Sequence, residues 1–237
     1  MYEKDKKMGL YIDAGTTYTK IISTDILPEL EPQIKTEQRK FDYNYYVIES
    51  KDLKNFNNKE VAKFCGHMSG TSTGENEIIA LAKGAANYIK DDRNATVLDL
   101  GSRDAKWVSF RNGKFNDMDW NTSCASSTGA TVEMLLKFYD LKVEDLEYTD
   151  EKFVVTCGIF GLEKIMDSIS KGEKPSIAVS KFVHGIAYNA WNFAKKPQKL
   201  YLSGGFCNNL CLVKSLKKYC EVIPLGRFVL CEGLIDE

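Results

Sequence analysis

The alternation of hydrophobic and polar residues predicts two short β-hairpins with closely matching sequences. Residues 11–23 read YIDAGTTYTKIIS, and residues 97–109 read VLDLGSRDAKWVS. In both segments, β-favouring residues flank a turn of glycine and a hydroxyl residue, which is typical of two antiparallel strands. An aspartate, the glycine, the hydroxyl residue and a lysine fall in one register in the two segments. We interpret the segments as an internal repeat, because unrelated turns seldom share all four residues.

Hydrophobic residues at steps of three and four predict two helices further along the chain. The first helix covers residues 128–139 and has the apolar face Val132, Leu135, Leu136 and Tyr139. The second follows the strand-like run FVVT and has the apolar face Ile159, Leu162, Ile165, Met166 and Ile169. A third strand, KLYL, leads into Ser203-Gly204-Gly205 and a further helical stretch. We expect residues 25–74, which are charged and aromatic, to form strands and loops of a small first domain.

Composition and charge indicate a soluble globular protein. The chain has 237 residues, of which 43% are hydrophobic and 27% charged, so it can bury a core without disulfide bonds. The net charge of −1 does not suggest a nucleic-acid-binding surface. No apolar run approaches the roughly 20 residues that a membrane helix needs, and the charged N-terminus does not resemble a signal peptide. We therefore expect a cytoplasmic location, with no nucleic acid or membrane as partner.

Two of the seven cysteines lie at predicted helix starts, where a cysteine can be a buried core residue, a reactive nucleophile or a metal ligand. Cys124 lies at or just before the start of the first predicted helix, and Cys157 lies at the start of the second. Helix N-termini stabilise negative charge, including that of thiolates that bind metal. A [4Fe–4S] cluster needs four thiolates, so a symmetric pair of chains would be required to hold one.

The other cysteines and both histidines carry no ligand pattern, and we interpret them as structural. These residues are Cys65, Cys207, Cys211, Cys220, Cys231, His67 and His184. The spacing of Cys207 and Cys211, four residues apart, predicts that they share one face of a helix.

The repeated turns have the composition of a phosphate-binding site. Backbone amides of a Gly-Ser/Thr turn form a concave site for anions, and the nearby lysine adds positive charge. Asp13 and Asp99, at the ends of the first strands, suit Mg²⁺, which prefers carboxylate, phosphate and water oxygens. Two facing turns, one from each domain, would bind a polyphosphate between them. The GxxxxGK[ST] phosphate loop is absent from the sequence.

The order of the two turns and the SGG segment resembles that of the phosphate-1, phosphate-2 and adenosine motifs of the actin/Hsp70/sugar-kinase superfamily. The resemblance implies two actin-like (ribonuclease H-like) α/β domains with a nucleotide cleft between them, the first domain being trimmed. Domain I is expected to comprise residues 1–90 together with residues 226–237. Domain II is expected to comprise residues 91–225, which contain both helix-start cysteines.

Five segments, two of them within the repeated hairpins, point to a narrower family. They include IDAGTT, DLGSRDAK and ENEIIALAKGA, NTSCASSTGATVE at residues 121–133 and VTCGIFGLEKI at residues 155–165. In content and order they resemble motifs of the activator ATPases of 2-hydroxyacyl-CoA dehydratases, in the BadF/BadG/BcrA/BcrD ATPase family. The chain departs from that family's pattern at Ser127, where glycine is usual, at Ala130, where arginine is usual, and at Arg103, where glutamine is usual.

This resemblance implies a role for each residue at a matching position. Cys124 and Cys157 would bind half of a [4Fe–4S] cluster shared by a homodimer. Asp13, Asp99 and Asp104 are the expected catalytic carboxylates, which would arrange Mg²⁺ and the attacking water. ATP or ADP would bind at Gly15, Thr16, Thr17, Lys20, Gly101, Ser102, Arg103, Gly204, Gly205 and Asn208.

The resulting hypothesis is an ATP-dependent reductive activator. ATP hydrolysis would rearrange the domains, and one electron would pass to a 2-hydroxyacyl-CoA dehydratase or a related enzyme, with a reduced ferredoxin or flavodoxin as donor. Two alternatives stay open. One is a small-molecule kinase of the same fold with Asp99 or Asp104 as its base. The other is a non-catalytic partner protein that binds nucleotide or a cluster. The sequence does not identify the partner enzyme or its acyl-CoA.

Overall fold

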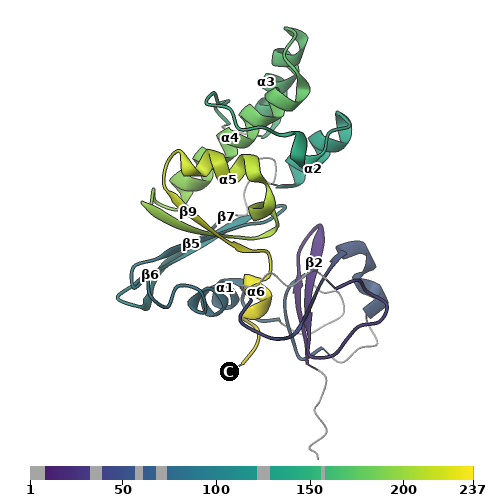
Figure 1. The fold of residues 1–237 in the computed structure, drawn as a ribbon, viewed down its shortest axis with the longest axis vertical. Helices are drawn as coiled ribbons and strands as arrows, with labels where there is room; N and C mark the ends of the chain where they lie inside the picture. Colours follow the sequence, from purple (N-terminus) through teal and green to yellow (C-terminus); the bar gives the residue numbers. More distant parts are fainter. Residues whose placement is uncertain are drawn as a thin grey trace, which may run out of the picture. The chain divides into compact units, whose positions relative to one another are not determined.

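The chain forms two compact α/β units, which Figure 1 shows as a ribbon. The first unit comprises Met1–Ile89 and Phe228–Glu237, and the second comprises Lys90–Arg227. Each unit is built on its own β-sheet. The computed structural model describes residues 9–32, 39–56, 61–67, 74–121, 129–155 and 158–236.

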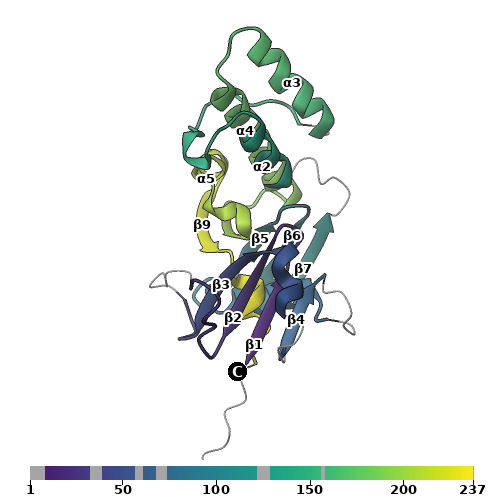
Figure 2. The same cartoon turned by 90° about the vertical axis from the view of Figure 1, so that its right-hand side faces the viewer.

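The first unit contains a four-stranded sheet in the order β3-β2-β1-β4 (Figure 2). Its strands are β1 (Leu10–Ala14), β2 (Tyr18–Ser23), β3 (Asn44–Glu49) and β4 (Lys63–Gly66). Strand β1 is antiparallel to β2 and parallel to β4, and β3 is antiparallel to β2. The hairpin predicted at residues 11–23 is confirmed. Buried Leu10, Ile12 and Ile21 from this hairpin form the centre of the unit's main core.

Two helices of the first unit approach each other so closely that only glycine fits at their contact. The helical segments of this unit are η1, a 3-10 helix (Ser50–Phe56), α1 (Glu77–Ala86) and α6 (Val229–Glu232). A Cβ atom on Gly84 would overlap the carbonyl oxygen of Val229, and a Cβ atom on Gly233 would overlap that of Ala80. The backbones of α1 and the α6 region are therefore in direct contact.

The second unit contains a five-stranded sheet in the order β7-β6-β5-β8-β9. Its strands are β5 (Thr96–Leu100), β6 (Ala105–Arg111), β7 (Lys114–Asn121), β8 (Lys199–Ser203) and β9 (Glu221–Gly226). Strand β5 has an antiparallel neighbour, β6, on one side and a parallel neighbour, β8, on the other. Strand β1 has the same two kinds of neighbour, so the repeat seen in the sequence is also a repeat of strand topology.

The helices of the second unit bury one large apolar core against this sheet. They are α2 (Gly129–Phe138), α3 (Gly158–Ser170), α4 (Pro175–Phe193), α5 (Leu210–Lys217) and the 3-10 helices η3 (Val143–Asp145) and η4 (Gly205–Asn208). Leu135 of α2 and Ile165 of α3 are buried in the core, which confirms both helices predicted from periodicity. In the described part of the chain, no helix combines the length and the hydropathy needed to span a bilayer.

Two details of the predicted helices are wrong. The apolar spacing assigns Met166 to the buried face of α3, but its side chain is 62% exposed. Ile165 occupies the buried face, and the next residue lies about 100° further round the helix. Cys207 and Cys211 do not share a helix face, because η4 ends between them and Asn209 begins α5 as its N-cap. Both thiols are nevertheless buried in the core, as predicted.

His184 is structural, as predicted. The ring is fully buried, and Nδ1 lies 2.9 Å from the carbonyl oxygen of Thr149 and 3.1 Å from that of Glu151. Because both partners are acceptors, Nδ1 carries the proton, and Nε2 accepts from the hydroxyl of Tyr219 at 2.9 Å. Burial lowers the pKa of His184, so the neutral imidazole is favoured.

A buried carboxylate ties α6 to the rest of the first unit. Glu232 is 1% exposed and accepts hydrogen bonds from Tyr45 (3.2 Å), Tyr88 (2.7 Å) and Arg39 (3.3 Å). The Arg39 guanidinium also lies 5.5 Å from the centre of the Phe228 ring. Burial raises the pKa of Glu232, although Arg39 and the tyrosines act in the opposite direction.

We expect the contribution of Glu232 to the stability of the folded protein to grow as the pH falls through the titration range of this residue. The raised pKa means that the folded protein takes up this proton at a higher pH than the unfolded chain. The contribution of Glu232 to the free energy of unfolding should therefore rise as the pH falls from the raised pKa towards the ordinary value of 4.5. Glu232→Gln should lose this part of the pH dependence, as measured by urea unfolding at a series of pH values. Glu221→Gln, at an exposed position, is the control and should keep the pH dependence of the wild type. If the free energy of unfolding of Glu232→Gln depends on pH as it does in the wild type, the expectation is wrong.

Candidate functional site

The first predicted turn is held by an ion pair across the β1–β2 hairpin. Asp13 and Lys20 lie opposite each other in the register, and Lys20 Nζ is 3.0 Å from Asp13 Oδ2. Asp13 is only 5% exposed, so its carboxylate needs a partner in the folded protein. The lysine of the repeat thus neutralises the aspartate at the end of the first strand.

The turn itself is supported from the segment after β3. A Cβ atom on Gly15 would lie 2.6 Å from the carbonyl oxygen of Tyr18, so a larger residue would force the turn to open. The Ser50 hydroxyl donates to the carbonyl oxygen of Gly15 at 2.6 Å, and the Ser50 amide donates to that of Thr17 at 2.9 Å. Thr16 is exposed at the tip. Ser50 therefore fixes the turn, although it lies outside the sequence motif.

The second turn has the same ion pair and an additional carboxylate. Lys106 is 3% exposed and lies opposite Asp99 in the register. Its Nζ is 4.0 Å from Asp99 Oδ2 and 3.1 Å from Asp104 Oδ2. The amide of Gly101 donates to the carbonyl oxygen of Asp104 at 3.0 Å, which closes the turn. Ser102 is half-buried and Arg103 is exposed. Two predicted catalytic carboxylates therefore surround one buried ammonium group.

The third motif lies beside the second turn. Strand β8 runs parallel to β5, and the Ser203 hydroxyl donates to Asp99 Oδ1 at 2.8 Å. Gly204 has φ +94°, and a Cβ atom there would overlap the carbonyl oxygen of Leu100. A Cβ atom on Gly205, in contrast, would meet no atom within 4 Å. Asn208, also predicted to bind nucleotide, is exposed at the end of η4.

The fold brings together the predicted residues of each unit by itself. Asp99, Gly101, Asp104 and Gly204 are neighbours in the second unit, at the adjoining ends of β5 and β8. Gly15, Thr16, Thr17, Lys20 and Asp13 form the corresponding turn of the first unit. Sequence reasoning missed Ser203 as a partner of Asp99. Its position directly before Gly204-Gly205, at the end of a predicted strand, is a signal that could have identified it.

The helix that follows the Cys124 segment begins on the second turn. The amides of Gly129 and Ala130 donate to the carbonyl oxygens of Gly101 (3.3 Å) and Ser102 (2.8 Å). Cys124 and Cys157, the predicted metal ligands, lie outside the described residues. Among the residues that are described, no group of three or more histidine, cysteine, aspartate or glutamate side chains could hold a metal ion.

Two buried thiols lie next to the first turn but are not suited to metal binding. Cys65 Sγ is 3.8 Å from Asp13 Oδ1, and Cys231 Sγ donates to the carbonyl oxygen of Tyr11 at 3.1 Å. Burial, together with the Asp13 carboxylate, raises the pKa of both thiols well above its ordinary value. They therefore stay protonated, in agreement with their interpretation as core residues.

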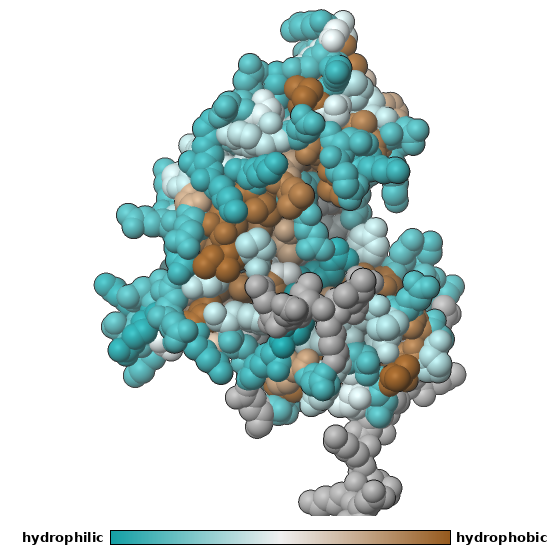
Figure 3. Space-filling model, viewed as in Figure 1, coloured by the Kyte–Doolittle hydropathy of each residue, from teal (hydrophilic) through white to brown (hydrophobic). Residues whose placement is uncertain are grey.

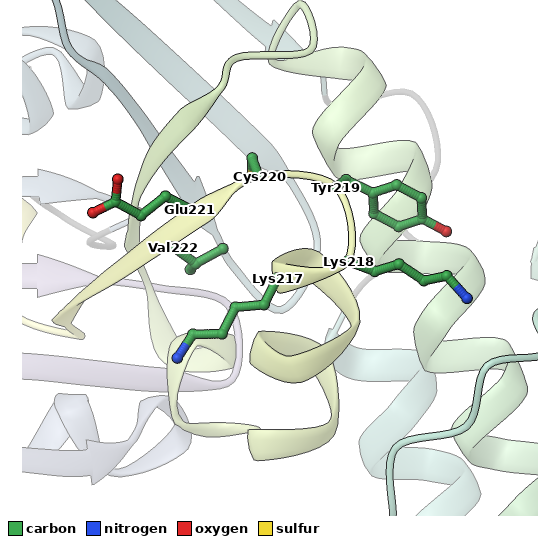
Figure 4. Close-up of a pocket in the computed structure, with 6 residues that line it drawn as sticks. All are labelled: Lys217, Lys218, Tyr219, Cys220, Glu221 and Val222. Atoms are coloured by element: carbon green, nitrogen blue, oxygen red, sulfur yellow. The ribbon is translucent and has the colours of Figure 1, made fainter.

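A surface depression elsewhere in the second unit does not coincide with the predicted site. It has a volume of about 540 Å³ and is lined by Lys217, Lys218, Tyr219, Cys220, Glu221 and Val222. Figure 4 shows that the charged side chains extend in different directions and do not converge on a common point. The face of the molecule drawn in Figure 3 is largely hydrophilic, and some hydrophobic residues gather on the part of this face that belongs to the second unit. We do not interpret this depression as a ligand site.

We expect the two adjacent glycines of the third motif to respond differently to alanine. Gly204→Ala should lower the free energy of unfolding by about 1–3 kcal/mol, because it places a side chain at a positive φ and against a carbonyl oxygen. Gly205→Ala adds a methyl group in open space and should change stability by less than about 0.5 kcal/mol. Urea unfolding of both variants tests this difference. Equal destabilisation by the two substitutions would contradict the geometry.

Comparison with known proteins gives one family match over most of the chain. The model of the "BadF/BadG/BcrA/BcrD ATPase family" matches residues 25–224. The (R)-2-hydroxyglutaryl-CoA dehydratase activating ATPase of Acidaminococcus fermentans is 24% identical over 123 residues, which are 48% of this chain and 47% of that protein. By these sequence alignments, the chain spans about half the length of the curated relatives that it matches.

Two solved structures share the fold. The activator of the 2-hydroxyisocaproyl-CoA dehydratase from Clostridium difficile with bound ADPNP has a TM-score of 0.71 at 18% identity, over 96% of this chain and 91% of that chain. Component A of the Acidaminococcus fermentans (R)-2-hydroxyglutaryl-CoA dehydratase has a TM-score of 0.67 at 20% identity, over 96% of this chain and 95% of that chain. These similarities confirm the predicted actin-like α/β fold class.

Proposed function

The chain belongs to the BadF/BadG/BcrA/BcrD ATPase family, and from this premise we propose that it binds and hydrolyses ATP to activate a 2-hydroxyacyl-CoA dehydratase or a related enzyme. The observation that carries the proposal is the repeated turn, in which a glycine lies between an aspartate and a lysine that pair across a hairpin. Relatives that match by sequence are named as activators of such dehydratases, which favours the activator over the kinase and the non-catalytic partner.

The second turn is suited to an anionic nucleotide. Lys106, a buried ammonium group, offsets part of the negative charge of Asp99 and Asp104, so a phosphate that approaches the turn meets less repulsion. The backbone at Gly205 is open, so a ligand can approach it without meeting a side chain. The forced conformation of Gly204 keeps this part of the backbone against β5. We propose that Gly101, Ser102 and Gly205 contact the nucleotide here, with Arg103 and Asn208 at the exposed edge.

The carboxylates of the two turns fit Mg²⁺ by their chemistry. Asp13 and Asp99 are oxygen donors at strand ends, and Mg²⁺ binds through one or two carboxylates together with water and phosphate oxygens. Ser203 and Lys106 hold the Asp99 carboxylate on two sides, so it needs little rearrangement to orient a water molecule. When bound, Mg²⁺ would neutralise charge on the phosphates. We propose that Asp13, Asp99 and Asp104 are the catalytic carboxylates.

We propose a [4Fe–4S] cluster as the second cofactor, on the basis of the donor set alone. Each chain offers two thiols at predicted helix starts, Cys124 and Cys157, and four thiolates hold such a cluster. A homodimer sharing one cluster meets this requirement. When bound, the cluster would supply one electron to the partner enzyme, after reduction by a ferredoxin or flavodoxin. The free cysteines of the described core fit a reducing compartment, so we also propose a cytoplasmic location.

We expect Asp99→Asn to lower the rate of ATP hydrolysis by about 10²-fold or more, a usual effect of losing a positioned acid–base group. The side-chain amide of asparagine has the same shape as the carboxylate and can still accept the hydrogen bond from Ser203. The Kd for nucleotide should therefore change much less than the rate of ATP hydrolysis. Phosphate release and ADPNP binding are measured on the same preparation. Asp117→Asn, on the exposed strand β7, is the control and should behave as the wild type. Undiminished hydrolysis by Asp99→Asn would remove Asp99 from the catalytic set.

We expect Cys124→Ala and Cys157→Ala each to abolish iron binding after anaerobic reconstitution, while nucleotide binding persists. The wild type should retain about four irons per dimer, with the absorption of a [4Fe–4S] cluster. Cys220→Ala is the control, because burial raises the pKa of that half-buried thiol to about 11 and it lies in no motif. Iron retained by Cys124→Ala, or lost by Cys220→Ala, would overturn the ligand assignment.

A further inference from the structure

The internal repeat extends to a third strand in each unit. In the second unit, Ser203 of β8 lies opposite Asp99 of β5 in the register and donates to Asp99 Oδ1 at 2.8 Å. In the first unit, Cys65 of β4 lies opposite Asp13 of β1, and its Sγ donates to Asp13 Oδ1 at 3.8 Å. Strands β4 and β8 each run parallel to the strand that carries the aspartate. Cys65 is therefore the counterpart of Ser203.

The glycine that follows each donor supports the same equivalence. Gly66 has φ +83° and Gly204 has φ +94°, so both adopt the left-handed backbone conformation. A Cβ atom on Gly66 would lie 2.3 Å from the carbonyl oxygen of Ala14, and a Cβ atom on Gly204 would lie 2.3 Å from that of Leu100. Each of these carbonyl groups belongs to the residue directly after the aspartate. The donor, the register, the positive φ and the close contact therefore recur together in the two units.

The two oxygens of the Asp13 carboxylate have different partners. Lys20 Nζ lies 3.0 Å from Oδ2, so the ammonium group faces one oxygen and the thiol of Cys65 faces the other. The lysine and the serine around Asp99 divide the two carboxylate oxygens in the same way. A carboxylate that is held from two sides is already oriented before a ligand arrives. The thiol thus restricts the direction in which Oδ1 points.

The thiol of Cys65 is suited to act as a hydrogen-bond donor. It is fully buried, and burial together with the Asp13 carboxylate raises its pKa well above the ordinary value, so the proton stays on sulfur. An ionised carboxylate can only accept, which fixes the direction of this hydrogen bond. Cys231, the other buried thiol beside the hairpin, donates instead to the backbone carbonyl oxygen of Tyr11 at 3.1 Å. The contact with a carboxylate distinguishes Cys65 from this neighbour.

We propose that Cys65 is a positioning residue for Asp13, in the way that Ser203 positions Asp99. The thiol holds Oδ1 of Asp13 in place, while Lys20 neutralises the carboxylate from the other side. A thiol is a weaker donor than a hydroxyl group, and in this unit the lysine is the closer of the two partners. This inference rests on the proposed function, in which Asp13 is a catalytic carboxylate, and it adds the residue that orients this carboxylate.

The first measurement is the infrared S–H stretching band of Cys65, isolated as the difference between spectra with cysteine and with serine at this position. The band should move to higher frequency in Asp13→Asn, because a neutral amide oxygen is a weaker acceptor than a carboxylate. The band of Cys231, isolated in the same way with Cys231→Ser, is the control and should move less, since its acceptor is a backbone carbonyl oxygen. A Cys65 band that stays in place in Asp13→Asn overturns the contact.

The second measurement is ATP hydrolysis by variants of the full chain. Cys65→Ala should lower kcat by about fivefold, which corresponds to the loss of one hydrogen bond, while the Kd for ADPNP changes less than kcat. Cys65→Ser keeps a donor at the same position and should restore most of the lost kcat. Cys231→Ala is the matched control, because it removes an equally buried thiol beside the same hairpin and should keep the kcat of the wild type. Urea unfolding establishes that each variant is folded.

The outcomes separate this inference from the proposed function. A kcat that falls in Cys65→Ala and recovers in Cys65→Ser supports the positioning role. An unchanged kcat in Cys65→Ala overturns it, as does an equal loss in Cys65→Ala and Cys231→Ala, since packing alone then accounts for the effect. A wild type that does not hydrolyse ATP removes the proposed function and any catalytic role of Cys65, whereas the infrared band still tests the contact with Asp13.

Discussion

Each half of the molecule depends on a lysine paired with an aspartate across a hairpin. A charged group cannot be withdrawn from water without a partner, and the strand register supplies that partner at the neighbouring position. Removing one member of such a pair leaves an uncompensated charge, which costs about 3–5 kcal/mol when the pair is buried. A shift of the strands would separate the pair, so the pair stabilises the register that places the turn residues. In the second unit the pair is also linked to Ser203 and Asp104, so one ammonium group organises residues from three strands or turns.

Most of the secondary structure around the site could be predicted from the sequence. The two hairpins, the helices at α2 and α3 and the strand before Gly204 all follow from short-range pattern, because period and turn composition depend on neighbouring residues. The burial of Cys207 and Cys211 was predicted correctly, but their shared helix face was not, since the cap at Asn209 redirects the chain. Met166 shows the same limit, because the apolar stripe of α3 is narrower than the run of hydrophobic residues in its sequence.

The contacts around the site could not be read from the sequence in the same way. Ser50 and Trp120, whose indole donates to Asp104, contact the motif residues from outside the motifs. Ser203 contacts Asp99 from the third motif, 104 residues further along the sequence. Their partners are set by which strands are neighbours in the sheet, and that order is a property of the whole unit. Cys124 and Cys157, in contrast, are assigned from the sequence alone. Their assignment comes from helix-start position and family resemblance, and they lie outside the described residues, so it stays a prediction.

The contact between α1 and the α6 region has a consequence for how the sequence can vary over evolutionary time. Gly84 and Gly233 each lie against a backbone carbonyl group of the other segment, so a side chain at either position would push the two segments apart. The segments are separated by about 140 residues of chain, yet neither glycine can be replaced while the other backbone stays in place. Homologues should therefore keep both glycines or lose them together with a change in this helix packing. The α6 region and helix α1 are therefore expected to change together in homologues, although they are far apart in the sequence.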